Sequence, residues 1–251
     1  MSRYFLELAY MGTRYAGFQR QENAHSVQAE VEQVLAKILR KPVILTGSSR
    51  TDAGVHALQN YFHFDTEHPI PASLVYNFNA VLPHDIVVKG LYLVADNAHC
   101  RFDAVARKYA YHISLTKDPF SYGRAYYFPY TLDVAAMQAA AQTLFSYHDF
   151  TSFSKRNTQV KTFLCQIEQS YWELVENGFI YHVRANRFLR GMVRGLTGTM
   201  LKVGRGKLSV DGFREIIEKR DCTLADFAVP GHGLFLEKVE YPAHVFNKVT
   251  G

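Results

Sequence analysis

Apolar and polar positions alternate along the chain in a pattern that predicts similar elements in both halves. In the first half, residues 4–10 alternate as a strand, and Ser26 precedes a run with helical spacing that Pro42 stops. The remaining predicted elements of this half are strands at residues 43–46, 61–65 and 86–94 and a short helix over residues 72–81. The predicted order is therefore strand, helix, strand, strand, helix, strand.

The second half repeats this order with longer elements. They are a strand at residues 108–115, a helix after Asp133, two long strands joined at Glu176-Asn177-Gly178, helices over residues 188–203 and 209–219, and a strand at residues 234–241. Asn-Gly between alternating runs is a strong hairpin signal. We therefore predict an α+β protein with two ferredoxin-like halves, residues 1–104 and 105–251, whose mixed and mainly antiparallel sheets surround a central basic cleft.

The composition is that of a globular protein. Hydrophobic residues make up 48% of the 251 positions, which is ample for a buried core. The N-terminus meets Arg3 and Glu7 before any signal-peptide core develops, and no apolar run approaches the roughly 18 residues of a membrane span. We therefore expect a cytoplasmic protein without a membrane segment. The wide spacing of Cys100, Cys165 and Cys222 predicts buried thiols, with neither a disulfide framework nor a zinc knuckle.

Positive charge is concentrated in one interval of the chain. The net charge of +5 is small, but the chain has no acidic residue between Glu176 and Asp211. The basic residues of this interval are Arg184, Arg187, Arg190, Arg194, Lys202, Arg205 and Lys207. Solvated surfaces normally intersperse both signs, so this basic tract favours a phosphate-binding segment over an ordinary surface.

The helix expected over residues 188–203 carries two distinctive stripes. Helical spacing puts three arginines on one stripe and three glycines on the next: Arg187, Arg190 and Arg194, then Gly191, Gly195 and Gly198. Each glycine costs about 0.8 to 1 kcal/mol of helix propensity relative to alanine. We expect the glycine stripe to pack tightly on a sheet and the arginine stripe to reach into the cleft.

Residues 50–57 (RTDAGVHA) set a carboxylate between a guanidinium and a glycine turn. Gly54 permits a positive φ, so Asp52 can face a cleft and becomes the first candidate for catalysis. The alternative is an Asx turn, in which Asp52 only bonds the backbone of Gly54.

This octapeptide resembles the RTDxGVHA signature of the TruA family of tRNA pseudouridine synthases. Further stretches resemble the family in the same order: GTRYAGFQRQ (12–21), HCRFDA (99–104), RKYAY (107–111), DFTSF (149–153), ANRFLRGMVR (185–194) and GLFL (233–236). The resemblance thus covers nearly the whole chain. Met11, Ser49, Cys100 and Asp103 replace the usual Asp, Gly, Ala and Ser, and these departures bear on the substrate range more than on the reaction.

The resemblance implies that a homodimer converts uridine to pseudouridine at positions 38, 39 and 40 of tRNA. It implies that Asp52 is the catalytic carboxylate, that Arg194 pairs with it, and that Tyr109 stacks on the flipped uracil. Asp52 can attack the sugar or the base, or remove the C2′ proton, and the sequence leaves these routes open. The reaction involves no net redox change, so no cofactor is expected.

Arg50, Arg187 and Arg190 are the expected RNA-binding residues. Arg50 either fills the space that the flipped base vacates or holds a phosphate, and the alternative for it is a surface salt bridge. The basic tract and exposed aromatic residues also suit a non-catalytic RNA-binding module, for which the charge of Asp52 is unfavourable. A nucleoside or RNA glycosidic-bond hydrolase, which would release free uracil, is the other alternative.

Three other short motifs do not match the patterns of known phosphate, dinucleotide or zinc sites. Residues 204–208 (GRGKL) lack the Ser or Thr that follows the Lys of a phosphate loop, and no GxGxxG follows a predicted strand. His63 and His68 belong to no HExxH pattern. We therefore expect neither a metal ion nor a dinucleotide.

Overall fold

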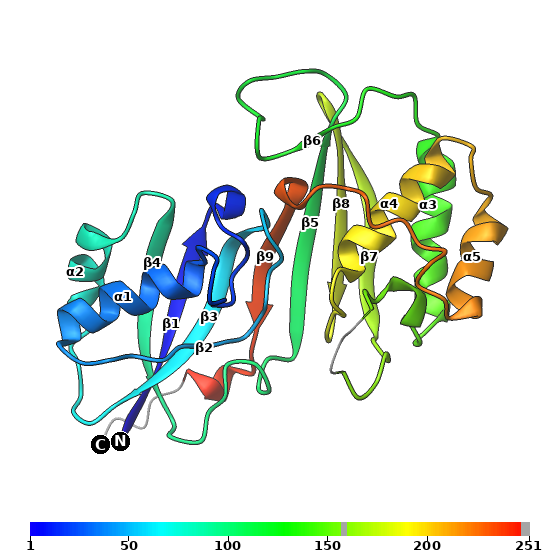
Figure 1. Ribbon diagram of the computed structural model, residues 1–251. Helices are drawn as coiled ribbons and strands as arrows, with labels where there is room; N and C mark the ends of the chain where they lie inside the picture. The colour runs from blue at the N-terminus through cyan, green and yellow to red at the C-terminus, as the bar shows by residue number, and fades with distance from the viewer. Residues whose placement is uncertain (157–159, 247–251) are drawn as a thin grey trace. The chain divides into compact units, whose positions relative to one another are not determined.

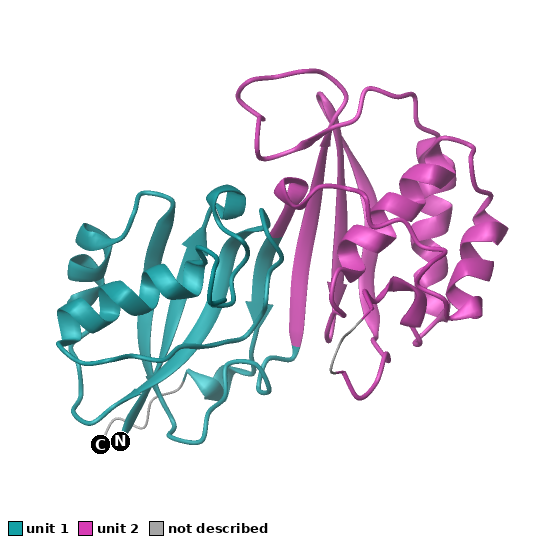
Figure 2. Cartoon of the chain, viewed as in Figure 1, with its two compact units in different colours: residues 1–105, 236–251 teal, residues 106–235 magenta. Residues whose placement is uncertain are grey.

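The computed structural model describes residues 1–156 and 160–246, which divide into two compact units (Figure 2). Unit 1 contains residues 1–105 and the described residues from Leu236 onward, and unit 2 contains residues 106–235. Strand β9 (Leu234–Glu240) thus begins in unit 2 and ends in unit 1, whereas the sequence assigns this stretch to the second half. Within the described ranges, no helix is long and apolar enough to cross a bilayer.

Unit 1 has the predicted order of strands and helices (Figure 1). Its elements are β1 (Ser2–Tyr10), α1 (Val27–Leu39), β2 (Thr46–Gly47), β3 (His56–Thr66), α2 (Leu74–Val81) and β4 (Ile86–Val94). The central strand β1 pairs antiparallel with β3 on one side and with β4 on the other, and β2 pairs with β3. As predicted, the Ser26 side chain caps α1 by accepting a hydrogen bond from Ala29 N–H.

Both faces of strand β1 are covered. Successive side chains point to opposite faces of a strand. Tyr4 stacks with Phe64 on one face, with ring centroids 5.9 Å apart, while Phe5 meets Phe246 on the other at 6.1 Å. The strand therefore buries five consecutive residues, from Tyr4 to Leu8, rather than every second one.

Unit 2 repeats the order strand, helix, strand, strand, helix, with a short strand and a second helix added, and it shares the final strand β9 with unit 1. Its elements are β5 (Ala106–Ser114), β6 (Tyr126–Tyr127), α3 (Val134–Thr143), β7 (Ile167–Val175), β8 (Gly178–Ala185), α4 (Met192–Gly204) and α5 (Val210–Lys219). Strand β8 lies between β5 and β7, antiparallel to both, and the hairpin predicted at Asn177-Gly178 is confirmed. Helices α3, α4 and α5 lie on one side of these strands (Figure 1). The α+β class with mainly antiparallel strands is thereby confirmed.

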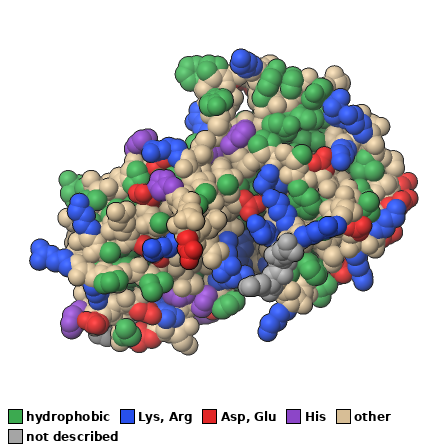
Figure 3. Space-filling view, viewed as in Figure 1, with side chains coloured by type: hydrophobic (Ala, Val, Ile, Leu, Met, Phe, Trp, Pro, Cys, Tyr) green, Lys and Arg blue, Asp and Glu red, His purple; other side chains and the backbone are tan. Residues whose placement is uncertain are grey.

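Short 3-10 helices complete the described chain. They are η1 (Gly12–Arg14), η2 (Leu144–Ser146), η3 (Thr151–Phe153), η4 (Gly231–Gly233) and η5 (Ala243–Val245). The segment between β5 and α3, which includes β6, exposes several aromatic residues: Phe120, Tyr122, Tyr127 and Tyr130. Figure 3 shows hydrophobic side chains at the surface of this segment, at the top of the view.

The strand predicted at residues 43–46 is wrong except for Thr46. Val43 and Leu45 are buried and Ile44 is exposed, so the alternation is real. The backbone of Leu45, however, bonds side chains of α1: its N–H donates to Glu32 at 2.9 Å and its carbonyl accepts from Gln28 at 2.9 Å. Helix side chains thus take the place of a neighbouring strand.

The predicted start of α4 at residue 188 is also wrong. Gly191 has a φ of 74°, in the left-handed region, and α4 begins only at Met192. Arg187 and Arg190 therefore precede the helix and share no helical stripe with Arg194. The close approach predicted along the glycines is present, but its partner is a loop, because a Cβ on Gly198 would lie 2.3 Å from the Asp226 carbonyl oxygen.

Candidate active site

Asp52 lies on the loop that leads into β3. The Val55 N–H donates to the Asp52 carbonyl at 3.2 Å, which closes a turn around Gly54, and Gly54 has a φ of 76°. The Gly54 N–H donates to the Tyr15 carbonyl at 3.3 Å, so the donor that an Asx turn needs is engaged with another segment. The Asp52 side chain is half-buried, and Arg50 is exposed.

The segment around η1 packs directly on this loop. The Phe18 N–H donates to the Thr51 carbonyl at 3.0 Å, and the Gly12 N–H donates to Nδ1 of the fully buried His56 at 3.0 Å. A Cβ on Gly12 would lie 2.0 Å from the Val55 carbonyl oxygen, so only glycine fits there. Two stretches that resemble the family, residues 12–21 and 50–57, are thereby brought together.

A buried polar network holds the chain just before Asp52. The hydroxyls of Tyr10 and Thr51 are 2.8 Å apart, and Nδ2 of Asn60 donates to the Tyr10 hydroxyl at 3.1 Å. The same Nδ2 donates to the Ser49 carbonyl at 3.1 Å, while Oδ1 accepts from the Ser48 hydroxyl at 2.8 Å. Burial raises the pKa of Tyr10 to about 12, so its hydroxyl stays neutral. Sequence reasoning missed Asn60, because an isolated Asn in a strand carries no local signal.

We expect Asn60→Ala to lower both the stability and the turnover of the protein. The substitution leaves the Ser48 hydroxyl and the Ser49 carbonyl buried without their partner, which costs about 1 to 3 kcal/mol of unfolding free energy in urea titrations. The control is Asn79→Ala, because the Asn79 side chain makes two bonds to the Val88 backbone away from the loop. It should lower stability but keep kcat, and an equal loss of kcat in both variants would contradict a role for Asn60 in placing Asp52.

Tyr109 lies on β5 in unit 2 and is half-buried. Its ring meets Phe188 edge to face, with centroids 5.1 Å apart and planes at 84°. Arg107 lies two residues earlier on the same face of the strand, and its guanidinium donates to the Asn186 carbonyl at 3.1 Å. Tyr109 is therefore positioned both by strand β5 and by the turn before α4.

The turn before α4 places Arg187 and Arg190. Its start is fixed by Asn186, whose Oδ1 accepts from the Gln166 N–H at 2.9 Å. Its end is fixed by the Arg190 carbonyl, which accepts from the Lys155 N–H at 2.9 Å. The Arg190 side chain is exposed and that of Arg187 is half-buried. Both therefore lie on a turn whose two ends are fixed by hydrogen bonds.

Arg194 lies in the first turn of α4 and is anchored to the loop that follows α5. Its Nε donates to the Val229 carbonyl at 2.8 Å and its NH2 group to the Phe227 carbonyl at 3.3 Å. The Tyr111 hydroxyl donates to the neighbouring Pro230 carbonyl at 2.7 Å. This loop positions a candidate site residue, yet sequence reasoning missed it. The glycine stripe of α4 was the available signal, because its glycines allow another segment to pack closely, and that segment is this loop.

Part of the basic tract is engaged within the chain. Arg184 pairs with Glu168, Nζ of Lys202 lies 3.1 Å from Asp226, and the Arg205 guanidinium lies 3.8 Å from the centre of the Tyr130 ring. These side chains contribute less free positive charge than the sequence suggests. Arg190 and Lys207 of the tract are exposed and Arg187 is half-buried, so solvent reaches all three side chains.

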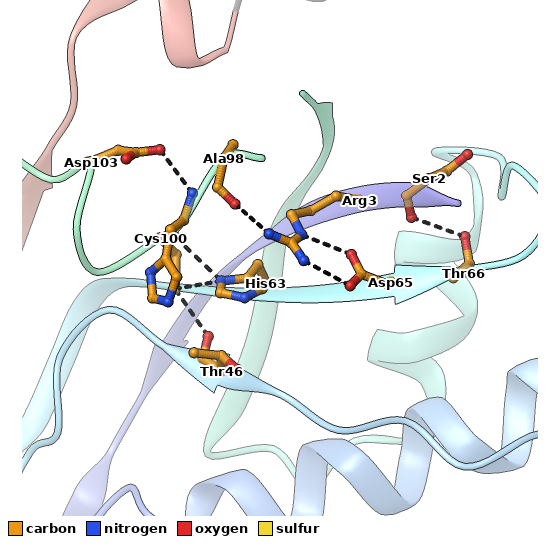
Figure 4. A network of polar contacts seen from close by, with 10 residues as sticks. Ser2, Arg3, Thr46, His63, Asp65, Thr66, Ala98, Cys100 and Asp103 are labelled. Carbon is orange, nitrogen blue, oxygen red and sulfur yellow. Dashed lines mark hydrogen bonds and ion pairs between the residues drawn. The ribbon is translucent and has the colours of Figure 1, made fainter. Parts of the chain in front are cut away.

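One cluster in unit 1, His63, His99 and Cys100, has ligand atoms close enough to surround a metal ion (Figure 4). Nδ1 of His63 accepts from the Cys100 N–H at 3.3 Å, and Nδ1 of His99 accepts from the Arg101 N–H at 3.1 Å. A nitrogen that accepts a backbone N–H has its lone pair engaged, so the same atom is a poor metal ligand. Burial lowers the pKa of His63 to about 4, which keeps the ring neutral and lets its Nδ1 accept the Cys100 N–H. We assign the cluster to holding the turn at residues 98–103.

The candidate site residues belong to a chain with similar proteins in several bacteria. A protein named tRNA pseudouridine synthase A in Parabacteroides distasonis is 47% identical over 249 residues, which cover 98% of each chain. This chain belongs to the tRNA pseudouridine synthase A family. Proteins of the same name in Bacteroides thetaiotaomicron (46% identity, 100% of this chain and 94% of that protein) and Staphylococcus aureus (39%, 94% and 90%) are also similar.

A family model described as tRNA pseudouridine synthase matches residues 140–242. This range contains Arg187, Arg190 and Arg194 and the loop that anchors Arg194. The relatives, which match nearly the whole chain, confirm the family resemblance first noted in RTDAGVHA and in the other stretches.

Proposed function

We propose that this protein converts uridine to pseudouridine in the anticodon stem-loop of tRNA, at positions 38, 39 and 40, with Asp52 as its catalytic carboxylate. The observation that supports the proposal is the way the Asp52 loop is held. The half-buried Asp52 carboxylate lies on a turn that a buried polar network fixes on one side and the segment around η1 fixes on the other. The chain belongs to a family of tRNA pseudouridine synthases, in which such a carboxylate has a chemical use. A rigid mount of this kind keeps a reactive group in place.

The reaction rearranges one nucleotide without adding or removing atoms overall. The bond between N1 of uracil and C1′ breaks, the base turns, and C5 bonds to C1′. The hydrogen on C5 leaves to solvent, and N1 gains a proton. An ionised Asp52 serves this chemistry as a nucleophile towards the sugar or base, or as the base that takes the C2′ proton. Each route requires a charged oxygen and no cofactor.

The remaining roles follow from the family resemblance. We assign Tyr109 to stacking on the flipped uracil, because base stacking on an aromatic ring contributes about 1 to 3 kcal/mol. Arg194 is assigned to keeping the catalytic carboxylate charged and oriented, and the carbonyls that anchor its guanidinium limit its freedom. Arg50, Arg187 and Arg190 are assigned to the RNA backbone.

We expect the affinity for tRNA to fall as salt rises, with a shallower dependence after Arg190→Ala or Arg187→Ala. Each phosphate contact that is lost lowers the slope of log affinity against log salt by roughly one unit. Filter binding over a range of salt concentrations measures this slope. Lys37→Ala, on α1 in unit 1, is the control and should leave it unchanged. Wild-type slopes for both arginine variants would place the turn before α4 away from the RNA.

We also propose, from the family resemblance, that the protein is a cytoplasmic homodimer. Analytical ultracentrifugation should then give a particle of twice the chain mass at micromolar concentration. A single species of one chain mass at the concentration used for activity assays would contradict the homodimer.

Nucleoside analysis of tRNA after incubation with the purified protein tests the function. Formation of pseudouridine with no change in total base content is the expected result. Unchanged tRNA that binds the protein would favour an RNA-binding module. Free uracil in the supernatant would favour a glycosidic-bond hydrolase.

A further inference from the structure

A hollow of about 290 Å³ lies in unit 1 beside the catalytic loop. The residues that line it are Phe18, Gln19, Gln28, Leu45, Thr46, Gly47, Arg50, His99, Arg101 and Phe102. This lining includes two arginines and no carboxylate, so it suits an anionic ligand. Arg50 stands two residues before Asp52, a separation that spans at most about 7 Å of extended chain. The hollow therefore adjoins the site proposed for the reacting uridine.

One large aromatic residue of this lining is exposed on a rigid turn. Phe102 exposes 74% of its surface, and its ring lies against that of His99 with centroids 4.2 Å apart. The turn is fixed from within, because Oδ2 of Asp103 accepts from the His99 N–H at 2.8 Å and the Cys100 thiol donates to the Thr46 carbonyl at 3.0 Å (Figure 4). An exposed ring on a turn fixed in this way is preorganised for stacking.

We propose that this hollow binds the nucleotide next to the target uridine, with its base stacked on Phe102 and its phosphate at Arg50 and Arg101. The proposal rests on the proposed function. The Arg101 guanidinium lies 5.9 Å from the centre of the Phe102 ring, so one nucleotide can reach both side chains. A stacking face accepts any base. The hollow therefore secures the strand beside the flipped uridine without selecting its sequence.

Steady-state tritium release from tRNA labelled at C5 of uracil tests this site. Phe102→Ala should raise KM by about tenfold or more and leave kcat within about twofold, while Phe102→Tyr should keep the wild-type KM because it retains the stacking face. Tyr76→Ala is the matched control, because Tyr76 exposes 79% of its surface on α2 outside the hollow. It should behave as wild type.

Photocrosslinking gives a second readout that does not depend on turnover. A stem-loop with 5-iodouridine on either side of the target position is irradiated with Asp52→Asn protein, and a crosslinked peptide containing Phe102 is expected. A wild-type KM for Phe102→Ala, or crosslinks only to other aromatic residues, would overturn the site. Wild-type protein that releases no tritium would instead overturn the proposed function.

Discussion

Asp52→Asn is expected to abolish the release of tritium from tRNA labelled at C5 of uracil, while binding of tRNA persists. Asparagine keeps nearly the same shape as aspartate but has neither its charge nor its nucleophilic oxygen. The affinity for tRNA should stay the same or rise, because a negative charge leaves a site that meets phosphates. Tritium counting and filter binding on the same preparation measure both quantities.

Asp96→Asn is the matched control for this substitution. Asp96 is an exposed carboxylate in the same unit, on the loop after β4, and its amide should leave tritium release unchanged. Thermal unfolding of both variants is measured beside tritium release, so that a loss of activity through unfolding is recognised. Tritium release near the wild-type rate from Asp52→Asn would rule out Asp52 as the catalytic carboxylate.

Tyr109→Phe is expected to bind tRNA normally but to lose much of the rate, and Tyr109→Ala to lose both. Phenylalanine keeps the stacking face and the edge contact with Phe188, and only the hydroxyl is missing. Alanine also removes the stacking contribution of about 1 to 3 kcal/mol, which corresponds to a roughly 5- to 150-fold weaker complex. Single-turnover kinetics separate the rate from the binding step.

Tyr171→Ala provides the comparison for Tyr109. Tyr171 is a partly exposed tyrosine on β7 that stacks on His182 with centroids 4.9 Å apart, so its loss removes a ring pair from the same unit. It should change neither the rate nor the binding of tRNA. Wild-type turnover in both Tyr109 variants would assign Tyr109 to packing of the core.

The fold was predictable where local signals and tertiary partners agree. Ser26 and Asp133 cap helices as their residue types predict, and Asn177-Gly178 forms the predicted hairpin. The errors arose where distant groups decide the local structure. The strand expected at residues 43–46 is wrong because Glu32 and Gln28 bond the backbone of Leu45. The alternation of apolar and polar residues does not reveal whether a strand or helix side chains will bond that backbone.

The candidate site was predictable only in its parts. The RTDAGVHA stretch singled out Asp52 because a carboxylate beside a glycine turn is a local pattern. Asn60, Tyr10 and Gly12 hold this loop or the strand beside it in place. They make these contacts with residues far away in the sequence, so no local pattern predicts them. The arginine stripe failed for a related reason, because a left-handed Gly191 ends the turn before α4 begins.

Site-resolved mapping of pseudouridine in an unmodified tRNA transcript tests the central claim most directly. Wild-type protein should form pseudouridine at positions 38, 39 or 40, wherever the transcript has uridine, and should release no uracil. Asp52→Asn protein at the same concentration should form none. Pseudouridine formed by Asp52→Asn, or uracil released by the wild-type protein, would contradict an Asp52-dependent isomerisation.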